Sequence, residues 1–233
     1  MSADRQTARP AGRTLVLLGG GGHAAVVADA ARAAGWSVAG YLDDAGGSRG
    51  PESTAPLPWL GRIDDLKAVL ASLEPGAAAH AAIGDARCRR RWHDSIAPAS
   101  AAAVVHPSAV VSPSAVIEAG SFIGPLGVVN ARTRVGRGVI VNSGAIVEHD
   151  CDLGAFCHVA SGSILAGGVA VGEGALIGAG SAVLPGVRIG DRATLGAGAV
   201  ADKDLPEGVT ATGVPARVRA ASALTQEPVP GSR

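Results

Sequence analysis

An aliphatic residue recurs at every sixth position between residues 105 and 195. The register is unbroken through Val105, Val111, Ile117, Ile123, Val129, Val135, Val141, Val147, Leu153, Val159, Leu165, Val171, Ile177, Val183, Ile189 and Leu195. A period of six fits neither the 3.6-residue period of an α-helix nor simple strand alternation. It is typical of short strands separated by tight turns, stacked so that the aliphatic side chains share one interior column. The sequence therefore predicts a parallel β-helix of hexapeptide repeats.

Two further positions of the repeat are restricted. The residue two places before the aliphatic one is usually small, as at Ala145 and Ala175, and would fit a tight corner. The residue directly after is often Gly or Asn, as at Gly124 and Asn130, and we expect it to provide a positive φ angle or a close backbone approach. The pattern resembles the left-handed β-helix with three hexapeptides per coil, which gives about five coils here.

The segment before the repeats is predicted to be a small α/β unit. Strands are expected at residues 14–18, 36–42 and 78–83, and helices at residues 24–34, 64–73 and 86–96. We therefore expect a Rossmann-like domain with a parallel sheet over residues 14–98, followed by the left-handed parallel β-helix over residues 103–218. Residues 1–13 and 220–233 are expected to be disordered.

Composition narrows the class of protein. The 20 Lys and Arg residues balance the 20 Asp and Glu residues, so the formal net charge is zero. This argues against an electrostatic grip on nucleic acid or on an anionic membrane. The three cysteines lack metal-type spacing, and neither a signal peptide nor an apolar run of membrane-spanning length is evident. We expect a soluble, cytoplasmic protein.

A glycine run at residues 19–22 separates the first predicted strand from the first predicted helix, and Asp43 and Asp44 follow the next strand. Backbone N–H groups at such a helix start can approach a phosphate, and an acidic residue about twenty positions on can bind a ribose or base. A small sheet favours a mononucleotide-type ligand over NAD. The alternative is that the glycines only form a tight turn.

Titratable residues interrupt the otherwise bland repeat at Glu148, His149 and Asp150, with His158 nine residues later. A histidine next to a carboxylate suits general-base work. Nine residues are half of the assumed coil, so the two histidines should lie on opposite sides of one prism and meet only across subunits. A trimer closes naturally on a three-sided prism. The alternatives are a solvated turn at residues 148–150 and a structural role for His158.

Metal binding is a weaker hypothesis. Carbonic anhydrases of the γ class also use a left-handed β-helix with histidine ligands between subunits. Here His149 and His158 have no suitably spaced third histidine, so no metal site is expected.

Six motifs in fixed order support a family assignment. They are residues 19–24 (GGGGHA), 41–44 (YLDD), 82–85 (AIGD), 106–109 (HPSA), 147–151 (VEHDC) and 213–216 (GVPA). Together they resemble the sugar O-acyltransferases of the sialic acid O-acetyltransferase type. That family includes nucleotide-sugar N-acetyltransferases that act on UDP-4-amino sugars and on GDP-perosamine.

The resemblance implies roles for individual residues. His149 would be the catalytic base, assisted by Asp150 and Glu148. Acetyl-CoA would lie along the β-helix between subunits of a homotrimer, at His158, Gly167 and Gly178, with a backbone N–H near Gly167 stabilising the oxyanion. The nucleotide-linked sugar would contact Gly21, His23, Asp43, Asp44, Gly84 and Asn142.

The function expected from this resemblance is acetyl-CoA-dependent N-acetylation of a nucleotide-linked amino sugar. Transfer would be direct, with no acyl-enzyme and no metal. Two alternatives stay open at this point: an O-acetyltransferase acting on sialic acid-like or other sugars, and a nucleotide-binding scaffold without catalysis.

Overall fold

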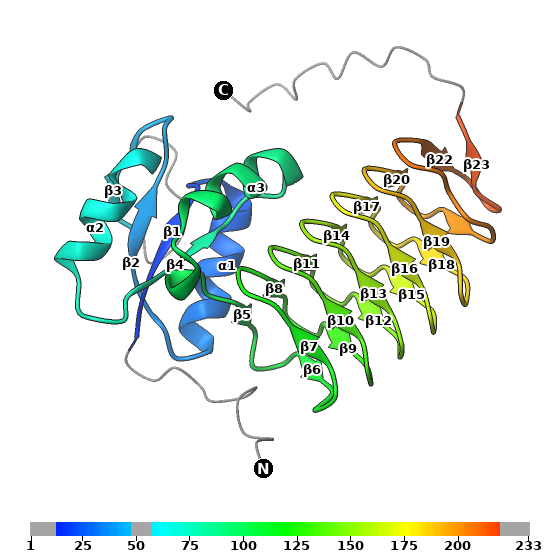
Figure 1. Ribbon diagram of the computed structural model, residues 1–233, viewed down its shortest axis with the longest axis horizontal. Helices are drawn as coiled ribbons and strands as arrows, with labels where there is room; N and C mark the ends of the chain where they lie inside the picture. Colours follow the sequence, from blue (N-terminus) through cyan, green and yellow to red (C-terminus); the bar gives the residue numbers. More distant parts are fainter. Residues whose placement is uncertain (1–12, 48–56, 220–233) are drawn as a thin grey trace.

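The computed structural model describes residues 13–47 and 57–219, which form an α/β domain and a long β-helix (Figure 1). The α/β domain holds a four-stranded parallel sheet of order β3-β2-β1-β4. Its elements are β1 (Thr14–Leu18), α1 (Gly22–Ala33), β2 (Ser37–Leu42), β3 (Trp59–Gly61), η2 (Ile63–Asp65), α2 (Leu66–Ser72), β4 (Ala78–Ala81), α3 (Ala86–Ser95) and η3 (Pro98–Ser100). The disorder predicted for the two ends concerns residues 1–12 and 220–233, which lie outside the described residues.

Strand β1 is buried on both faces, as the apolar run predicts. Leu15 and Leu17 pack in one cluster with α1, whereas Val16 and Leu18 pack with Leu66 of α2 in another. Strand β3 was not predicted from the sequence, because three residues after a Gly- and Pro-rich stretch carry no periodic signal. It extends the sheet by pairing in parallel with β2.

The β-helix consists of two-residue strands at six-residue intervals. They are β5 (Val104–Val105), β6 (Val110–Val111), β7 (Val116–Ile117), β8 (Phe122–Ile123), β9 (Val128–Val129), β10 (Arg134–Val135), β11 (Ile140–Val141), β12 (Ile146–Val147), β13 (Asp152–Leu153), β14 (His158–Val159), β15 (Ile164–Leu165), β16 (Ala170–Val171), β17 (Leu176–Ile177), β18 (Ala182–Val183), β19 (Arg188–Ile189), β20 (Thr194–Leu195) and β21 (Val200–Ala201). Two unpredicted strands, β22 (Thr210–Thr212) and β23 (Arg217–Val218), close the end.

From β5 to β18, each strand pairs with the strand eighteen residues further on, as in Arg134 with Asp152 and Ile146 with Ile164. The predicted left-handed β-helix with three hexapeptides per coil is therefore confirmed. Its three sheets are named here by their outward side chains or neighbours: the domain-facing sheet (β5, β8, β11, β14, β17, β20, β22, β23), the aliphatic sheet (β6, β9, β12, β15, β18, β21) and the charged sheet (β7, β10, β13, β16, β19).

The turns differ from the expectation in one respect. Positive φ angles occur three positions after the inward aliphatic residue, for example at Gly144 (φ 66°) and Gly162 (φ 69°), and not directly after it. The glycine directly after the aliphatic residue is needed for close backbone approach alone. A Cβ on Gly172 would lie 2.4 Å from the backbone nitrogen of Asp191 on the next coil.

Helix α3 joins the two parts of the molecule through Arg89. Four arginines make this helix look like a solvated surface helix in the sequence, but the Arg89 side chain is buried, with 1% exposed. Its guanidinium donates to the carbonyl oxygens of Gly84 (2.6 Å) on the α/β domain and of Gly138 (2.8 Å) on the β-helix. Hydrogen bonds from one cation to both parts fix the α/β domain against the coils.

None of the helices in the described ranges combines the length and the apolar character needed to cross a bilayer.

Candidate active site

The glycine run lies where the carboxyl end of β1 meets the start of α1. Gly21 is the N-cap of this twelve-residue helix, and no side chain caps it. A Cβ on Gly21 or Gly22 would meet nothing within 4 Å, so this side of the loop is open. Gly20, in contrast, packs against the Tyr41 ring, where a Cβ would come within 2.5 Å. The loop is therefore an open, uncapped helix start that can accept a phosphate.

The aspartates that follow β2 lie beside this loop, as expected from the parallel sheet. Asp43 accepts hydrogen bonds from the backbone of Gly20 (2.8 Å) and of Ala45 (2.8 Å), one on each carboxylate oxygen. Asp44 accepts one from the backbone of Ile63 at 3.2 Å. Asp43 thus shapes the glycine loop. Asp44 also pairs with Arg62 through Oδ1, and its Oδ2 has no partner among the described residues.

His23 lies at the junction of the two parts. Its ring meets Phe122 of β8 edge-to-face, with 5.4 Å between centroids. Its Nε2 atom is buried and has no hydrogen-bond partner among the described residues. Burial, followed by the neighbouring His80, His158 and Arg89, lowers the pKa of His23 to about 3. A neutral imidazole with an unsatisfied nitrogen is a group that a ligand can complete.

His158 lies on the same side, in β14 of the domain-facing sheet. Asn142 donates from Nδ2 to Nε2 of His158 over 3.2 Å, while its own Oδ1 accepts from the backbone of Ser143. Burial and the Arg89 cation lower the pKa of His158 to about 4, so the ring is neutral at physiological pH. The structure therefore brings His158 and Asn142 together, next to the α/β domain and His23.

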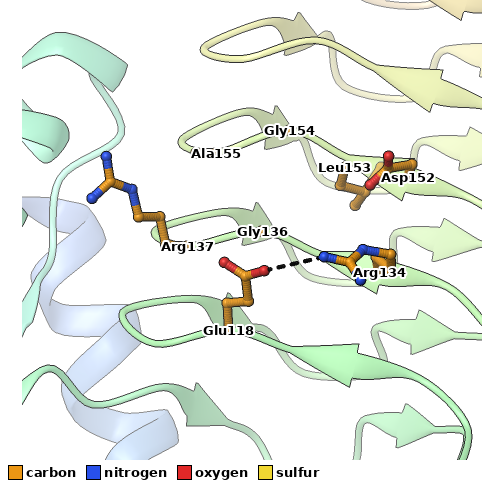
Figure 2. Close-up of a pocket in the computed structure, with 8 residues that line it drawn as sticks. All are labelled: Glu118, Arg134, Gly136, Arg137, Asp152, Leu153, Gly154 and Ala155. Carbon is orange, nitrogen blue, oxygen red and sulfur yellow. Dashed lines mark ion pairs between the residues drawn. The ribbon is translucent and has the colours of Figure 1, made fainter. Parts of the chain in front are cut away.

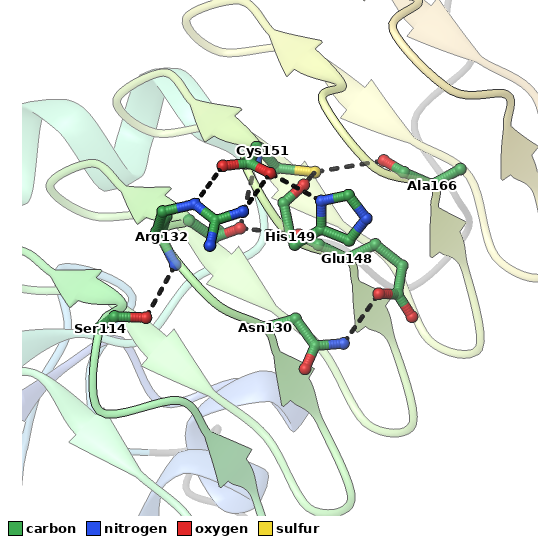
Figure 3. A network of polar contacts seen from close by, with 9 residues as sticks. Ser114, Asn130, Arg132, Glu148, His149, Cys151 and Ala166 are labelled. Atoms are coloured by element: carbon green, nitrogen blue, oxygen red, sulfur yellow. Dashed lines mark hydrogen bonds and ion pairs between the residues drawn. The ribbon is translucent and has the colours of Figure 1, made fainter.

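His149 occupies a different corner, in the turn after β12 of the aliphatic sheet (Figure 3). Its Nδ1 donates to Oδ2 of Asp150 at 2.7 Å, and the side chain is 58% exposed. Glu148, the other carboxylate expected to orient the ring, instead accepts from Nδ2 of Asn130 at 2.9 Å. Asp150 is therefore the residue that orients the imidazole. Because Nδ1 of His149 carries the proton in this bond, Nε2 is left as the basic nitrogen.

Asp150 is itself held from the coil below. Arg132 binds both of its oxygens, from Nε at 2.6 Å and from Nη2 at 2.7 Å. These bonds, and next the one from His149, hold the pKa of the Asp150 carboxyl well below its usual range. Neither Arg132 nor Asn130 was predicted from the sequence. The signal was present, since each lies one eighteen-residue coil before the carboxylate that it binds.

Gly167 lies one coil above His149. A Cβ on Gly167 would come 2.7 Å from Cε1 of the imidazole, so only glycine leaves room for the ring. The amides of Ala166 and Gly168 donate to other coils, to Val183 and to His149 itself. Within the described residues the Gly167 amide has no acceptor. A free N–H beside the basic nitrogen is the arrangement that an oxyanion requires.

Gly178 and Gly84, which were also predicted for the site, do not lie beside the His149 imidazole. Gly178 lies at another corner, after β17, where its carbonyl accepts from Ser163 and Ser181 and a Cβ would lie 2.5 Å from the backbone of Ala197. Close packing of the coils accounts for this glycine, which is not near His149. Gly84 follows β4, offers its carbonyl to Arg89, and has open space at its Cβ position.

A groove of about 220 Å³ runs along the charged sheet, away from these clusters (Figure 2). Glu118 and Arg134 line it and pair with each other at 3.7 Å. None of the residues predicted for the site lines this groove.

The two cysteines of the β-helix are not suited to act as nucleophiles. Burial raises the pKa of the Cys157 thiol to about 12 and also raises that of Cys151, so neither provides a thiolate. No three His, Cys, Asp or Glu side chains gather into a group that could hold a metal ion in the part of the chain that the structure describes.

Comparisons with known proteins assign both parts of the chain to known families. The chain matches the family model of the PglD N-terminal domain over residues 14–96, and that of the bacterial transferase hexapeptide (six repeats) over residues 168–202. PerB from Caulobacter crescentus, solved in complex with CoA and GDP-perosamine, is 39% identical over 90% of this chain and 99% of that chain, with a TM-score of 0.82. The chain belongs to the nucleotide-sugar N-acetyltransferase family.

Other members of this nucleotide-sugar N-acetyltransferase family are similar over the same length. The acetyltransferase domain of PglB from Neisseria gonorrhoeae FA1090 is 36% identical over 89% of this chain and all of that chain, with a TM-score of 0.81. A second structure of that domain, at 37% identity over 89% and 99% of the two chains and a TM-score of 0.79, contains acetyl coenzyme A. The predicted family, fold and enzyme class are therefore confirmed.

Proposed function

We propose that this chain transfers an acetyl group from acetyl-CoA to the amino group of a nucleotide-linked amino sugar. One observation carries the proposal: His149 is oriented through Nδ1 by Asp150, with Nε2 left basic, in a chain whose relatives bind CoA and GDP-perosamine. The open helix start at Gly21 supports binding of the nucleotide phosphates by the α/β domain.

The reaction follows from these groups. The sugar amine attacks the thioester carbonyl while Nε2 of His149 takes its proton, so that a C–N bond forms and a tetrahedral oxyanion develops. The free Gly167 N–H supports a role in stabilising that oxyanion. The C–S bond then breaks, and the proton held on the imidazolium is available to the departing CoA thiolate. No acyl-enzyme is needed, and the two substrates must be bound together.

The site needs more than one subunit. Within one chain the α/β domain packs on the domain-facing sheet, whereas His149 borders the aliphatic sheet. The outward side chains of the aliphatic sheet are all apolar: Val110, Val128, Ile146, Ile164, Ala182 and Val200. Val110 is 62% and Ile164 is 45% exposed. Such a face supports contact with a second copy of the chain.

A homotrimer is the assembly that we propose, because a three-sided prism closes with threefold symmetry. Each His149 would then face the α/β domain or the domain-facing sheet of a neighbour, where His23 and His158 lie. This assembly would bring together the two clusters that one chain keeps apart.

The acceptor class is tested by incubating the protein and acetyl-CoA with UDP-, GDP- and dTDP-linked amino sugars, and with sialic acid-like sugars. Release of the CoA thiol and the mass of the product are measured. An N-acetylated nucleotide sugar is the expected product. Transfer to a hydroxyl alone would indicate an O-acetyltransferase, and binding of both substrates without product would indicate a scaffold.

A further inference from the structure

Arg132 lies one coil below Asp150 and binds it with both arms of its guanidinium (Figure 3). The backbone N–H of Arg132 is in turn held by Oγ of Ser114, one coil lower still, at 3.1 Å. Ser114, Arg132 and Asp150 therefore form a column along the corner of the prism that ends at the His149 imidazole. Each member is fixed by the one below it.

The hexapeptide fold does not need this pair. Arg132 (φ 61°) and Asp150 (φ 60°) both occupy the left-handed turn position that the repeat usually fills with glycine. A side chain there costs on the order of 1 kcal/mol. Folding alone therefore favours glycine at both positions, and the pair requires another explanation.

We infer that Arg132 is a positioning residue for the acetyl transfer, acting through Asp150 on His149. The inference rests on the proposed function of His149 as the base. A carboxylate that is hydrogen-bonded at both oxygens cannot rotate away from the imidazole. The hydrogen bond from His149 Nδ1 to Asp150 therefore keeps its direction, and Nε2 keeps its orientation. The Arg132 guanidinium binds Asp150 and, among the contacts of the described residues, makes none with the His149 ring.

Arg132 also sets the charge around the ring. Asp150 and Glu148 face His149 from its own turn, and Glu148 is bound by the uncharged Asn130. The coil above contributes residues 166–168, which have no titratable side chain. Arg132 is the cation that offsets Asp150 in this set of described residues. Its removal would leave the carboxylate uncompensated, which favours the protonated imidazole.

The experiment compares Arg132→Gln with Arg132→Lys and a matched control, Arg192→Gln. Arg192 also lies at a left-handed turn position (φ 55°), pairs with Glu207, and belongs to another corner of the prism. We measure kcat/KM against pH with the preferred amino sugar, and we follow the titration of the His149 ring by NMR.

For Arg132→Gln we expect kcat/KM to fall roughly tenfold, as for other partners that orient a functional histidine. The acid limb of the profile and the ring titration should both move to higher pH. Arg132→Lys, which keeps the charge, should restore the titration but only part of the rate, and Arg192→Gln should behave as wild type. A rate loss without a shift in titration would overturn the inference, as would an unchanged rate.

The ring titration needs no substrate, so the two proposals can fail separately. A wild-type protein that acetylates no amine would refute the proposed function, while an upward shift in Arg132→Gln would still support the action of Arg132 on His149.

Discussion

Gly167 and His149 stand one above the other on successive coils, and a Cβ on Gly167 would come 2.7 Å from the imidazole Cε1. The imidazole thus packs against the bare backbone of Gly167, while its Nδ1 donates to Asp150. The orientation of the proposed base depends on one missing methyl group.

Gly167→Ala should therefore displace the imidazole. Since a shift of about 1 Å can cost about 100-fold in rate, we expect kcat to fall by that order. The midpoint of thermal unfolding should change little, because Gly167 has no left-handed φ and the His149 side chain is exposed and can move. Steady-state kinetics beside a thermal melt check this, and an unchanged kcat would contradict the assigned geometry.

Gly21→Leu tests the phosphate site in isolation. A Cβ at Gly21 meets nothing within 4 Å, and the backbone there (φ −85°) accepts any residue, so folding should be preserved. The new side chain would fill the open helix start. We expect the KM for the nucleotide sugar to rise roughly tenfold, corresponding to the loss of a helix-terminus contact, with the KM for acetyl-CoA unchanged. A rise in both constants would indicate damage elsewhere.

Ile164→Arg tests the assembly. Ile164 is 45% exposed on the aliphatic sheet, so an arginine there would place a charge in the proposed contact. Light scattering should show monomers, and the acetyl transfer should be lost with the trimer. Val116→Arg is the matched control, because Val116 is 41% exposed at the equivalent position of the charged sheet. Monomers that retained full activity would refute a site shared between subunits.

The histidines at the domain junction predict acid sensitivity. Burial lowers the pKa of His80 from 6.5 to about 4, against the hydrogen bond to Ala102, which raises it. Between pH 6.5 and about pH 4, His80 is largely protonated in the unfolded chain but largely neutral in the folded chain. The free energy of unfolding should therefore fall as pH drops through this window, by about 2 kcal/mol for His80 at pH 5.

The variant His80→Asn checks this dependence, because its amide can still donate to the Ala102 carbonyl that His80 Nδ1 contacts at 2.9 Å. Denaturant unfolding at pH 7 and pH 5 should give a smaller difference for the variant than for wild type. An equal difference would show that His80 is not among the groups responsible.

Much of the fold follows from local patterning. An aliphatic residue at every sixth position leaves few other ways to bury the side chains, so the β-helix was predictable through Leu195. The burial of Arg89 was not predictable, because its acceptors at Gly138 and Phe156 lie 49 and 67 residues away in the sequence. In isolation, a helix with four arginines resembles an exposed one.

The candidate site likewise has residues that the sequence predicted and residues that it did not. His149 and Asp150 were conspicuous because a bland repeat has no need of titratable side chains. Arg132 and Asn130 were missed because they are partners only through the eighteen-residue coil, which pairs residues that look unrelated along the chain. The roles predicted for Gly84, Asn142, His158 and Gly178 stay predictions.

The most direct test of general-base catalysis by His149 is the kcat/KM of His149→Asn with the preferred nucleotide-linked amino sugar, beside that of wild type. The ring is 58% exposed, so the variant should fold and assemble normally. We predict a loss of at least about 100-fold, the range for removal of a general base. A His149→Asn protein that assembles as wild type does and acetylates the amine at a similar rate would contradict the assignment of His149 as the base.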